Sequence, residues 1–206
     1  MMDYASNMLT PCTLEGELVR LIPLQPQHAA QLAQASLDGR LWELWYTSAP
    51  HPDWMEAEIA RRLAEHAAGR MLPFAIQRKD SGALCGMTTF MNLDPRNARL
   101  EIGSTWLARS AQRTGINTEA KLLLLSQAFE QIGCIAVEFR TNFMNHQSRT
   151  AIARLGAKQD GILRSAVLME NGVRRDTVVF SILDLEWPTV RQHLRFLLAR
   201  GAASAN

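Results

Sequence analysis

The fold of this chain is decided by the stretch WLARSAQRTGIN, residues 106–117, which joins an expected strand to a strongly apolar helix. The first turn of a helix has backbone N–H groups without intrahelical partners, and the aligned peptide dipoles add partial positive charge there. Gly115 allows close backbone approach or a positive φ, and Arg109 and Arg113 add charge around the same turn. The stretch therefore predicts a site for an anion such as phosphate at the start of the helix.

The helix after this turn is predicted over residues 116–132. Apolar side chains recur at helical spacing and should anchor it in the core, at Ile116, Ala120, Leu123, Leu124, Ala128 and Ile132. The alternative is an ordinary junction between strand and helix with solvated arginines. Two nucleotide motifs are absent, because the sequence has no G-x-x-x-x-G-K-[ST] segment and no G-x-G-x-x-G after a strand.

One loop pattern does match. The residues of the turn fit [QR]-x-x-G-x-[GA], with Asn117 where Gly or Ala is usual; they are Gln112, Arg113, Thr114, Gly115, Ile116 and Asn117. This pattern resembles the pyrophosphate loop of the Gcn5-related N-acetyltransferase (GNAT) superfamily. Further stretches occur in the order typical of its RimJ/RimL-like branch, the ribosomal-protein N-terminal acetyltransferase type: NHQSR (145–149), LGA (155–157), GILR (161–164), RDTVVFS (175–181) and EW (186–187).

The resemblance covers about residues 14–188 and implies a fold. It implies one N-acetyltransferase domain over 14–188, followed by a C-terminal helix and tail over 189–206. The expected class is α/β, with a mixed, mostly antiparallel central sheet of about seven strands flanked by helices. The residue pattern along the chain predicts strands at 18–24, 73–78, 83–90, 99–107, 136–141, 162–169 and 174–183. It predicts the remaining helices at 25–36, 53–68 with Asp53 as N-cap, 147–155 and 189–200.

The amino-acid composition argues against nucleic acid and membranes as binding partners. Among 206 residues, 22 Lys and Arg balance 20 Asp and Glu, so the chain has no global field suited to nucleic acid or an anionic membrane. Its three cysteines are widely spaced, the N-terminus lacks an export signal, and no apolar run reaches the length of a membrane span. We therefore expect a cytoplasmic protein without direct nucleic-acid or membrane binding.

Acetyl transfer to an amine needs a base, because an alkylammonium is mostly protonated near pH 7. Strand alternation places Glu101 on the face opposite Leu100 and Ile102, on the strand that feeds the loop, where the family commonly carries its base. The alternatives are that Glu101 is a solvated strand residue or that His146 is the base.

The resemblance also implies a co-substrate, acetyl-CoA, and no metal. The strand backbone over 104–107, including Trp106 and Leu107, would pair with the pantetheine arm and stabilise the carbonyl oxygen. Asn145 would bond the same arm, unless it only caps the next helix. Many members place a general-acid tyrosine where this chain has Ile152, whereas the Rim-type branch has a serine at Ser148, which could equally bond within its helix.

The acceptor is expected to be a small-molecule or peptide amine. Rigid aromatic faces in the segment 42–54, Trp42, Trp45 and Tyr46, would border its pocket, although the tryptophans could equally be core residues. The sequence thus predicts an acetyl-CoA-dependent N-acetyltransferase, and the resemblance is compatible with a homodimer. The main alternative is a non-catalytic acyl-CoA-binding or sensing module with the same fold. A Rossmann oxidoreductase is disfavoured by the missing glycine pattern.

Overall fold

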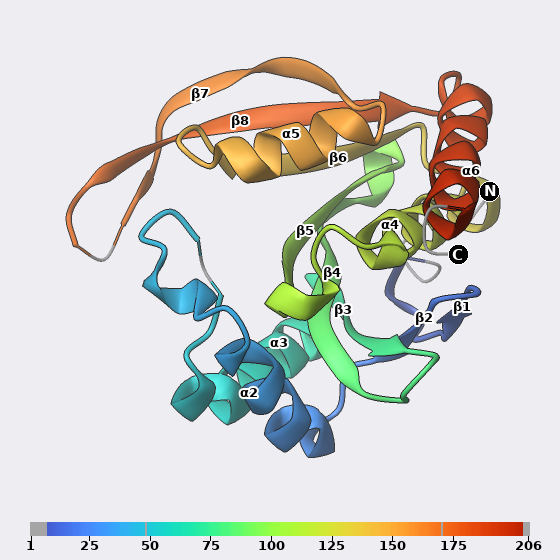
Figure 1. Cartoon of the computed structure of the whole chain (residues 1–206). Coiled ribbons are helices and arrows are strands. Elements are labelled where there is room, and N and C mark those ends of the chain that lie inside the picture. Colours follow the sequence, from blue (N-terminus) through green and yellow to red (C-terminus); the bar gives the residue numbers. More distant parts are fainter. Residues whose placement is uncertain (1–7, 48, 170, 204–206) are drawn as a thin grey trace.

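The computed structural model describes residues 8–47, 49–169 and 171–203, and they form a mixed sheet flanked by helices (Figure 1). The sheet has eight strands in the order β1-β2-β3-β4-β5-β6-β8-β7. Neighbouring strands are antiparallel, apart from the parallel pair β5 and β6. The predicted α/β class and mostly antiparallel sheet are confirmed. The eighth strand is β1, Leu14–Glu15, whose two residues are too short to show a pattern.

The seven predicted strands are all present. The first four are β2 (Val19–Pro23), β3 (Met71–Arg78), β4 (Leu84–Asp94) and β5 (Arg99–Leu107). The last three are β6 (Ala136–Asn142), β7 (Lys158–Leu168) and β8 (Arg174–Leu183). Only β5 and β8 have the predicted bounds, since the other strands extend or end within a few residues of the prediction. The turns that close the hairpins use Gly82 and Gly172 at positive φ, 71° and 78°.

Five helices surround the sheet in the described ranges: α2 (Ala29–Leu37), α3 (Met55–Ala67), α4 (Gly115–Ser126), α5 (His146–Arg154) and α6 (Trp187–Ala203). The prediction that Asp53 caps α3 is wrong. Asp53 lies inside a 3-10 turn, Pro52–Trp54, and its own N–H donates to the His51 Nδ1. Proline at the first position of that turn fixes φ, so the chain coils before α3 itself begins.

The helix predicted over 116–132 is two segments. After α4 the chain continues as a π-helical turn, Gln127–Ile132, which ends at Gly133 with φ 82°. The Cys134 N–H bonds back to the Ala128 carbonyl at 2.9 Å, which satisfies one of the free carbonyls at this end.

Apolar side chains fill both faces of the sheet. On one face, α4 and α6 cover a large core that contains Phe74, Ile76 and Leu124. On the other face, α2 and α3 cover a smaller core that contains Ala75 and Met87. Alternate residues of β3 therefore serve opposite cores, as the period of a strand requires. Helix α6 belongs to the larger core through Val190 and Leu194.

Candidate active site

The candidate site lies where the two parallel strands separate. β5 and β6 are in register only at Arg99↔Ala136, Leu100↔Val137 and Glu101↔Glu138. Beyond these pairs the strands diverge (Figure 1), and a cavity of about 870 Å³ lies between them. We call it the seam cleft. Its lining comes from both strands, from the turn before α4 and from α5, and includes Ser104, Thr105, Trp106, Leu107, Thr141 and Asn142.

A β-bulge shapes one wall of the seam cleft. The register between β4 and β5 shifts between Met87 and Thr89, so that β5 has one extra residue there. Ser104, which lies in this extra stretch, has φ 47°. A bulge re-aims the backbone of its strand, and here it lies within the segment 103–107 that faces the cavity.

The basic turn forms the next part of the wall. Gln112, Arg113, Thr114 and Asn117 line the seam cleft, and the Gln112 Nε2 donates to the Leu107 carbonyl at 2.9 Å. Thr114 caps α4, because its Oγ1 accepts the Ile116 N–H at 3.2 Å. The α4 N-terminus thus opens toward the cavity, where its free N–H groups suit an anion.

The positive φ in this turn is not at Gly115. Arg113 carries it, with φ 58°, whereas Gly115 is not among the residues with positive φ. A Cβ at Gly115 would lie 2.5 Å from the Leu18 Cδ1 and 3.4 Å from the Leu198 Cδ2, so glycine there serves packing. Ile116 points into the core and is 5% exposed. The two residues therefore contribute backbone to the turn and no side chain to the cavity.

Glu101 is buried, so the alternative of a solvated strand residue is wrong. It is 5% exposed, and its Oε2 accepts the Asn92 Nδ2 at 2.7 Å and lies 3.5 Å from the Arg140 Nε. Burial raises the pKa of this carboxyl, and the Asn92 hydrogen bond and Arg140 oppose the rise. Gly103 makes room for it, since a Cβ there would lie 2.7 Å from the Glu101 Oε1.

Glu101 is not itself among the described residues that line the cavity, but residues next to it are. Its chain neighbours Ile102 and Gly103 line the seam cleft, as does its partner Arg140. A buried carboxyl with a raised pKa beside a cavity fits the requirements of a general base, which works best when its pKa is near the working pH.

Helix α5 brings the other predicted residues to the opposite wall. Asn145, His146, Ser148 and Ile152 all line the seam cleft. The predicted alternative for Asn145, a helix cap, is confirmed, because its Oδ1 accepts the Ser148 N–H at 2.9 Å. Within residues 8–47, 49–169 and 171–203, its amide nitrogen makes no hydrogen bond. The Ser148 hydroxyl makes no hydrogen bond within the part of the chain that the structure describes.

Of the three predicted acceptor aromatics, Tyr46 lines the cavity. Among the described residues, neither Trp42 nor Trp45 belongs to the lining. Trp42 packs against His51, and Trp45 packs edge-on against Tyr46 and is 54% exposed. Trp54 is 70% exposed, so a core role for Trp45 and Trp54 is wrong.

The sequence analysis missed Lys121. This α4 residue is 5% exposed and lines the seam cleft beside the bulge. Its Nζ donates to the Thr105 Oγ1 at 2.7 Å and to the Thr88 Oγ1 at 3.2 Å. Burial without an acidic partner lowers the pKa of Lys121 to about 7.

Several donors at the cavity have no partner within the described residues. They are the buried nitrogens Trp106 Nε1, Asn142 Nδ2 and Arg175 Nε, and all three residues line the seam cleft. Buried donors are normally paired, so these fit a ligand that carries several acceptor oxygens, such as the amides and phosphates of an acyl-CoA.

Residues 8–47, 49–169 and 171–203 contain neither a metal-ligand cluster nor a helix that could span a membrane. No group of three or more His, Cys, Asp or Glu side chains is arranged to hold a metal ion there. None of the helices in these ranges is long and apolar enough to cross a membrane.

Comparison with known proteins agrees with this geometry. Residues 19–158 match a family model described as an acetyltransferase (GNAT) domain. A Bacillus subtilis protein named "Putative ribosomal N-acetyltransferase YdaF" is 36% identical over 106 residues, which are 52% of this chain and 57% of that protein. The chain thus spans less than two thirds of the length of this curated relative.

Solved structures match over more of the chain. A GCN5-related N-acetyltransferase from Brucella melitensis is 32% identical with a TM-score of 0.80, over 92% of this chain and 86% of that one. Mycobacterium smegmatis RimJ, in complex with CoA-disulfide, is 25% identical with a TM-score of 0.76, over 92% of this chain and 96% of that one. Family model, structures and cleft agree, and the chain belongs to the GNAT family of acetyltransferases.

Proposed function

We propose that this protein is an acetyl-CoA-dependent N-acetyltransferase whose active site is the seam cleft, within a single domain over residues 14–188. The observation that carries the proposal is the buried Glu101 beside a cavity that the basic turn before α4 also lines. The turn would hold the phosphates, and the unpaired donors Trp106 Nε1 and Asn142 Nδ2 would meet the polar atoms of the arm.

In the proposed reaction a neutral amine attacks the carbonyl carbon of the thioester. A C–N bond forms, the C–S bond breaks, and coenzyme A leaves as its thiol. Glu101 takes the proton that the ammonium must lose, through a water molecule, because Glu101 itself is not among the described residues that line the cavity. Burial favours this role by raising the pKa of Glu101.

The leaving thiolate needs a proton, and the developing negative charge on the carbonyl oxygen needs a donor. The free hydroxyl of Ser148 lines the same cavity and is our candidate for the first role. The backbone of the bulge, around Ser104 and Thr105, is our candidate for the second. Both roles rest on placement at the cavity and on the resemblance to the family.

The proposed acceptor is a primary amine of a protein N-terminus or of a small aminoacyl or peptide-like metabolite. Relatives carry ribosomal N-acetyltransferase or RimJ names, which favours this class. A nearly balanced charge provides no broad field for a large nucleic-acid-bearing acceptor. Recognition would then rest on the local pocket beside Tyr46.

A screen with acetyl-CoA tests the function. Free thiol would be measured while N-terminal peptides, aminoacylated nucleotides, polyamines and aminoglycosides are offered in turn. Thiol release that depends on a peptide or aminoacyl amine supports the proposal. Tight acetyl-CoA binding without release for any amine would instead favour the sensing module, and efficient acetylation of only polyamines or aminoglycosides would overturn the acceptor class.

Replacing Arg113 by glycine should weaken acetyl-CoA binding about 10- to 100-fold, the range of one lost charge-assisted hydrogen bond. Glycine keeps the positive φ of Arg113 while removing the charge. Calorimetry at low and high salt measures the effect, which should shrink as salt screens the charge. Arg96→Ala, at an arginine outside the seam cleft, is the control. Undiminished affinity of the folded Arg113→Gly protein would contradict the phosphate role.

Replacing Tyr46 by alanine should raise the acceptor KM, because Tyr46 lines the cavity. Trp45→Ala is a matched control, since Trp45 is the adjacent aromatic but lies outside the lining. Acetyl-CoA affinity should be nearly constant in both variants. Initial rates at varied acceptor concentration distinguish them, and an equal or larger KM change for Trp45→Ala would place the acceptor elsewhere along the segment 42–54.

A further inference from the structure

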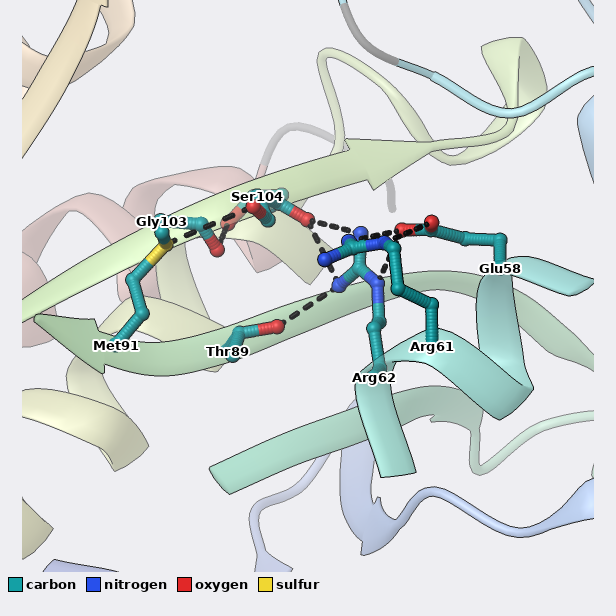
Figure 2. A network of polar contacts seen from close by, with 8 residues as sticks. Glu58, Arg61, Arg62, Thr89, Met91, Gly103 and Ser104 are labelled. Carbon is teal, nitrogen blue, oxygen red and sulfur yellow. Dashed lines mark hydrogen bonds and ion pairs between the residues drawn. The ribbon is translucent and has the colours of Figure 1, made fainter. Parts of the chain in front are cut away.

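A buried arginine on α3 reaches across the sheet to the bulge. Arg62 is 2% exposed, and its Nη1 donates to the Thr89 Oγ1 at 2.8 Å. Both terminal nitrogens donate to the Ser104 carbonyl, each at 3.3 Å, and the Nε donates to the Glu58 Oε1 at 2.7 Å. Figure 2 shows this guanidinium between α3, β4 and β5. One side chain therefore joins three elements at the bulge.

The carbonyl that Arg62 holds belongs to a strained residue. Ser104 has φ 47°, a left-handed conformation that L-residues rarely adopt, so its conformation depends on the surrounding contacts. Thr89, the second anchor, is buried and pairs with Gly103, next to the point where the β4–β5 register shifts. The Arg62 guanidinium thus contacts both β4 and β5 next to the point where their register shifts.

The neighbouring arginine shows that the contact is specific. Arg61 bonds the same carboxylate, with its Nε and Nη2 at 2.8 and 2.9 Å from the Glu58 oxygens. Its side chain is 53% exposed, and none of its hydrogen bonds within the described chain reaches a strand. The two arginines share a helix and an acidic partner, but only Arg62 contacts the bulge.

We propose that Arg62 is a positioning residue for acyl transfer: it holds the Ser104 carbonyl and so fixes the bulge backbone that faces the thioester. This inference rests on the proposed function of the seam cleft. Gly103, Ser104 and Thr105 line that cavity, so a shift of the bulge moves the groups proposed to meet the carbonyl oxygen. Misplacement by about 1 Å can lower a rate about 10²-fold.

The test uses Arg62→Met, Arg62→Lys and Arg61→Met, with Thr89→Val as a milder variant that keeps the arginine. Thiol-release kinetics would be measured below each variant's melting transition and normalised to the folded fraction. Arg62→Met should lower kcat for acetyl transfer about 10²-fold with a smaller change in acceptor KM. Arg62→Lys should have a higher kcat than Arg62→Met. An ammonium can donate to the Ser104 carbonyl but cannot reproduce the several planar N–H donors of the guanidinium. Arg61→Met should stay within about twofold, as for a surface ion pair.

Hydrogen exchange of the ligand-free protein gives a readout that does not need turnover. Exchange in Arg62→Met should accelerate at the bulge amides around 103–106 and stay unchanged in β2 and β8, while Arg61→Met matches the wild type. If Arg62→Met does not fold, Thr89→Val must show the same pattern at smaller amplitude.

The inference and the proposed function fail separately. Unchanged kcat in folded Arg62→Met, or in Thr89→Val when Arg62→Met does not fold, overturns the inference while the function stands. A wild type that binds acetyl-CoA without releasing thiol overturns the function, and the exchange pattern then decides whether Arg62 fixes the bulge.

Discussion

Replacing Glu101 by glutamine should lower kcat by about 10²- to 10⁴-fold, with acetyl-CoA affinity nearly unchanged. Glutamine keeps the shape and can still bond Asn92, but it cannot take a proton from the acceptor. Thiol release under saturating acetyl-CoA measures kcat, and calorimetry measures affinity.

The pH profile adds a second check. Because burial raises the pKa of Glu101, the wild-type rate should rise with pH as this carboxyl loses its proton. The Glu101→Gln variant should lose that rise. Glu65→Gln is the control, since Glu65 lies on α3, pairs with Arg70 and is not among the described residues that line the seam cleft. Full activity of Glu101→Gln at neutral pH would refute the base role and direct attention to His146.

Replacing Lys121 by methionine should stabilise the protein, most strongly near and below neutral pH. The wild type must bury a cation whose hydrogen-bond partners, Thr88 and Thr105, carry no charge. In the variant these two hydroxyls still bond each other, at 2.8 Å. An apolar chain of similar length removes the cost of burying the charge.

The sign of the pH dependence follows from the two states of Lys121. Its folded pKa is about 7, and an unfolded lysine titrates near about 10.4. Between these values the unfolded chain holds the proton and the folded chain does not, so wild-type stability rises with pH. The advantage of Lys121→Met is therefore full well below pH 7 and should shrink by about 2 kcal/mol between about pH 7 and 9.

Urea unfolding at several pH values measures this difference. Lys158→Met is the control, because Lys158 is exposed and its removal should give a small, nearly constant change. A destabilised Lys121→Met protein, or an advantage that does not vary with pH, would contradict the account of Lys121 as a buried charge.

The sequence predicted the elements well where periodicity and turn chemistry agree. β5 and β8 have their predicted bounds, because turn residues flank both strands. The capping role of Asp53 failed, since a proline turn came first, and the single long helix failed because its last turn widens into a π-helix. Neither the proline turn nor the π-helical turn changes the hydrophobic periodicity of the sequence enough to be predicted from it.

The site was predictable in outline. A local pattern predicts the turn before α4, and the resemblance adds Glu101 and Asn145. Arg62 and Lys121 were missed because each depends on a bulge that two other strands create. A signal existed for Arg62, which continues the buried stripe of Met55 and Ile59 on α3. A charge in an apolar stripe indicates a buried partner but does not say which one.

The short parallel seam also divides the chain in two. Strands β1–β5 come from residues 14–107 and β6–β8 from 136–183, and three register pairs join them. Apart from β1 and β2, neighbouring strands within each half share five or more register pairs, so the seam is the weaker connection. We therefore expect the β5–β6 pairing to open before most of the pairings within either half. A ligand bound between these strands would then stabilise the contact between the two halves. Its binding would therefore slow amide exchange in both halves together.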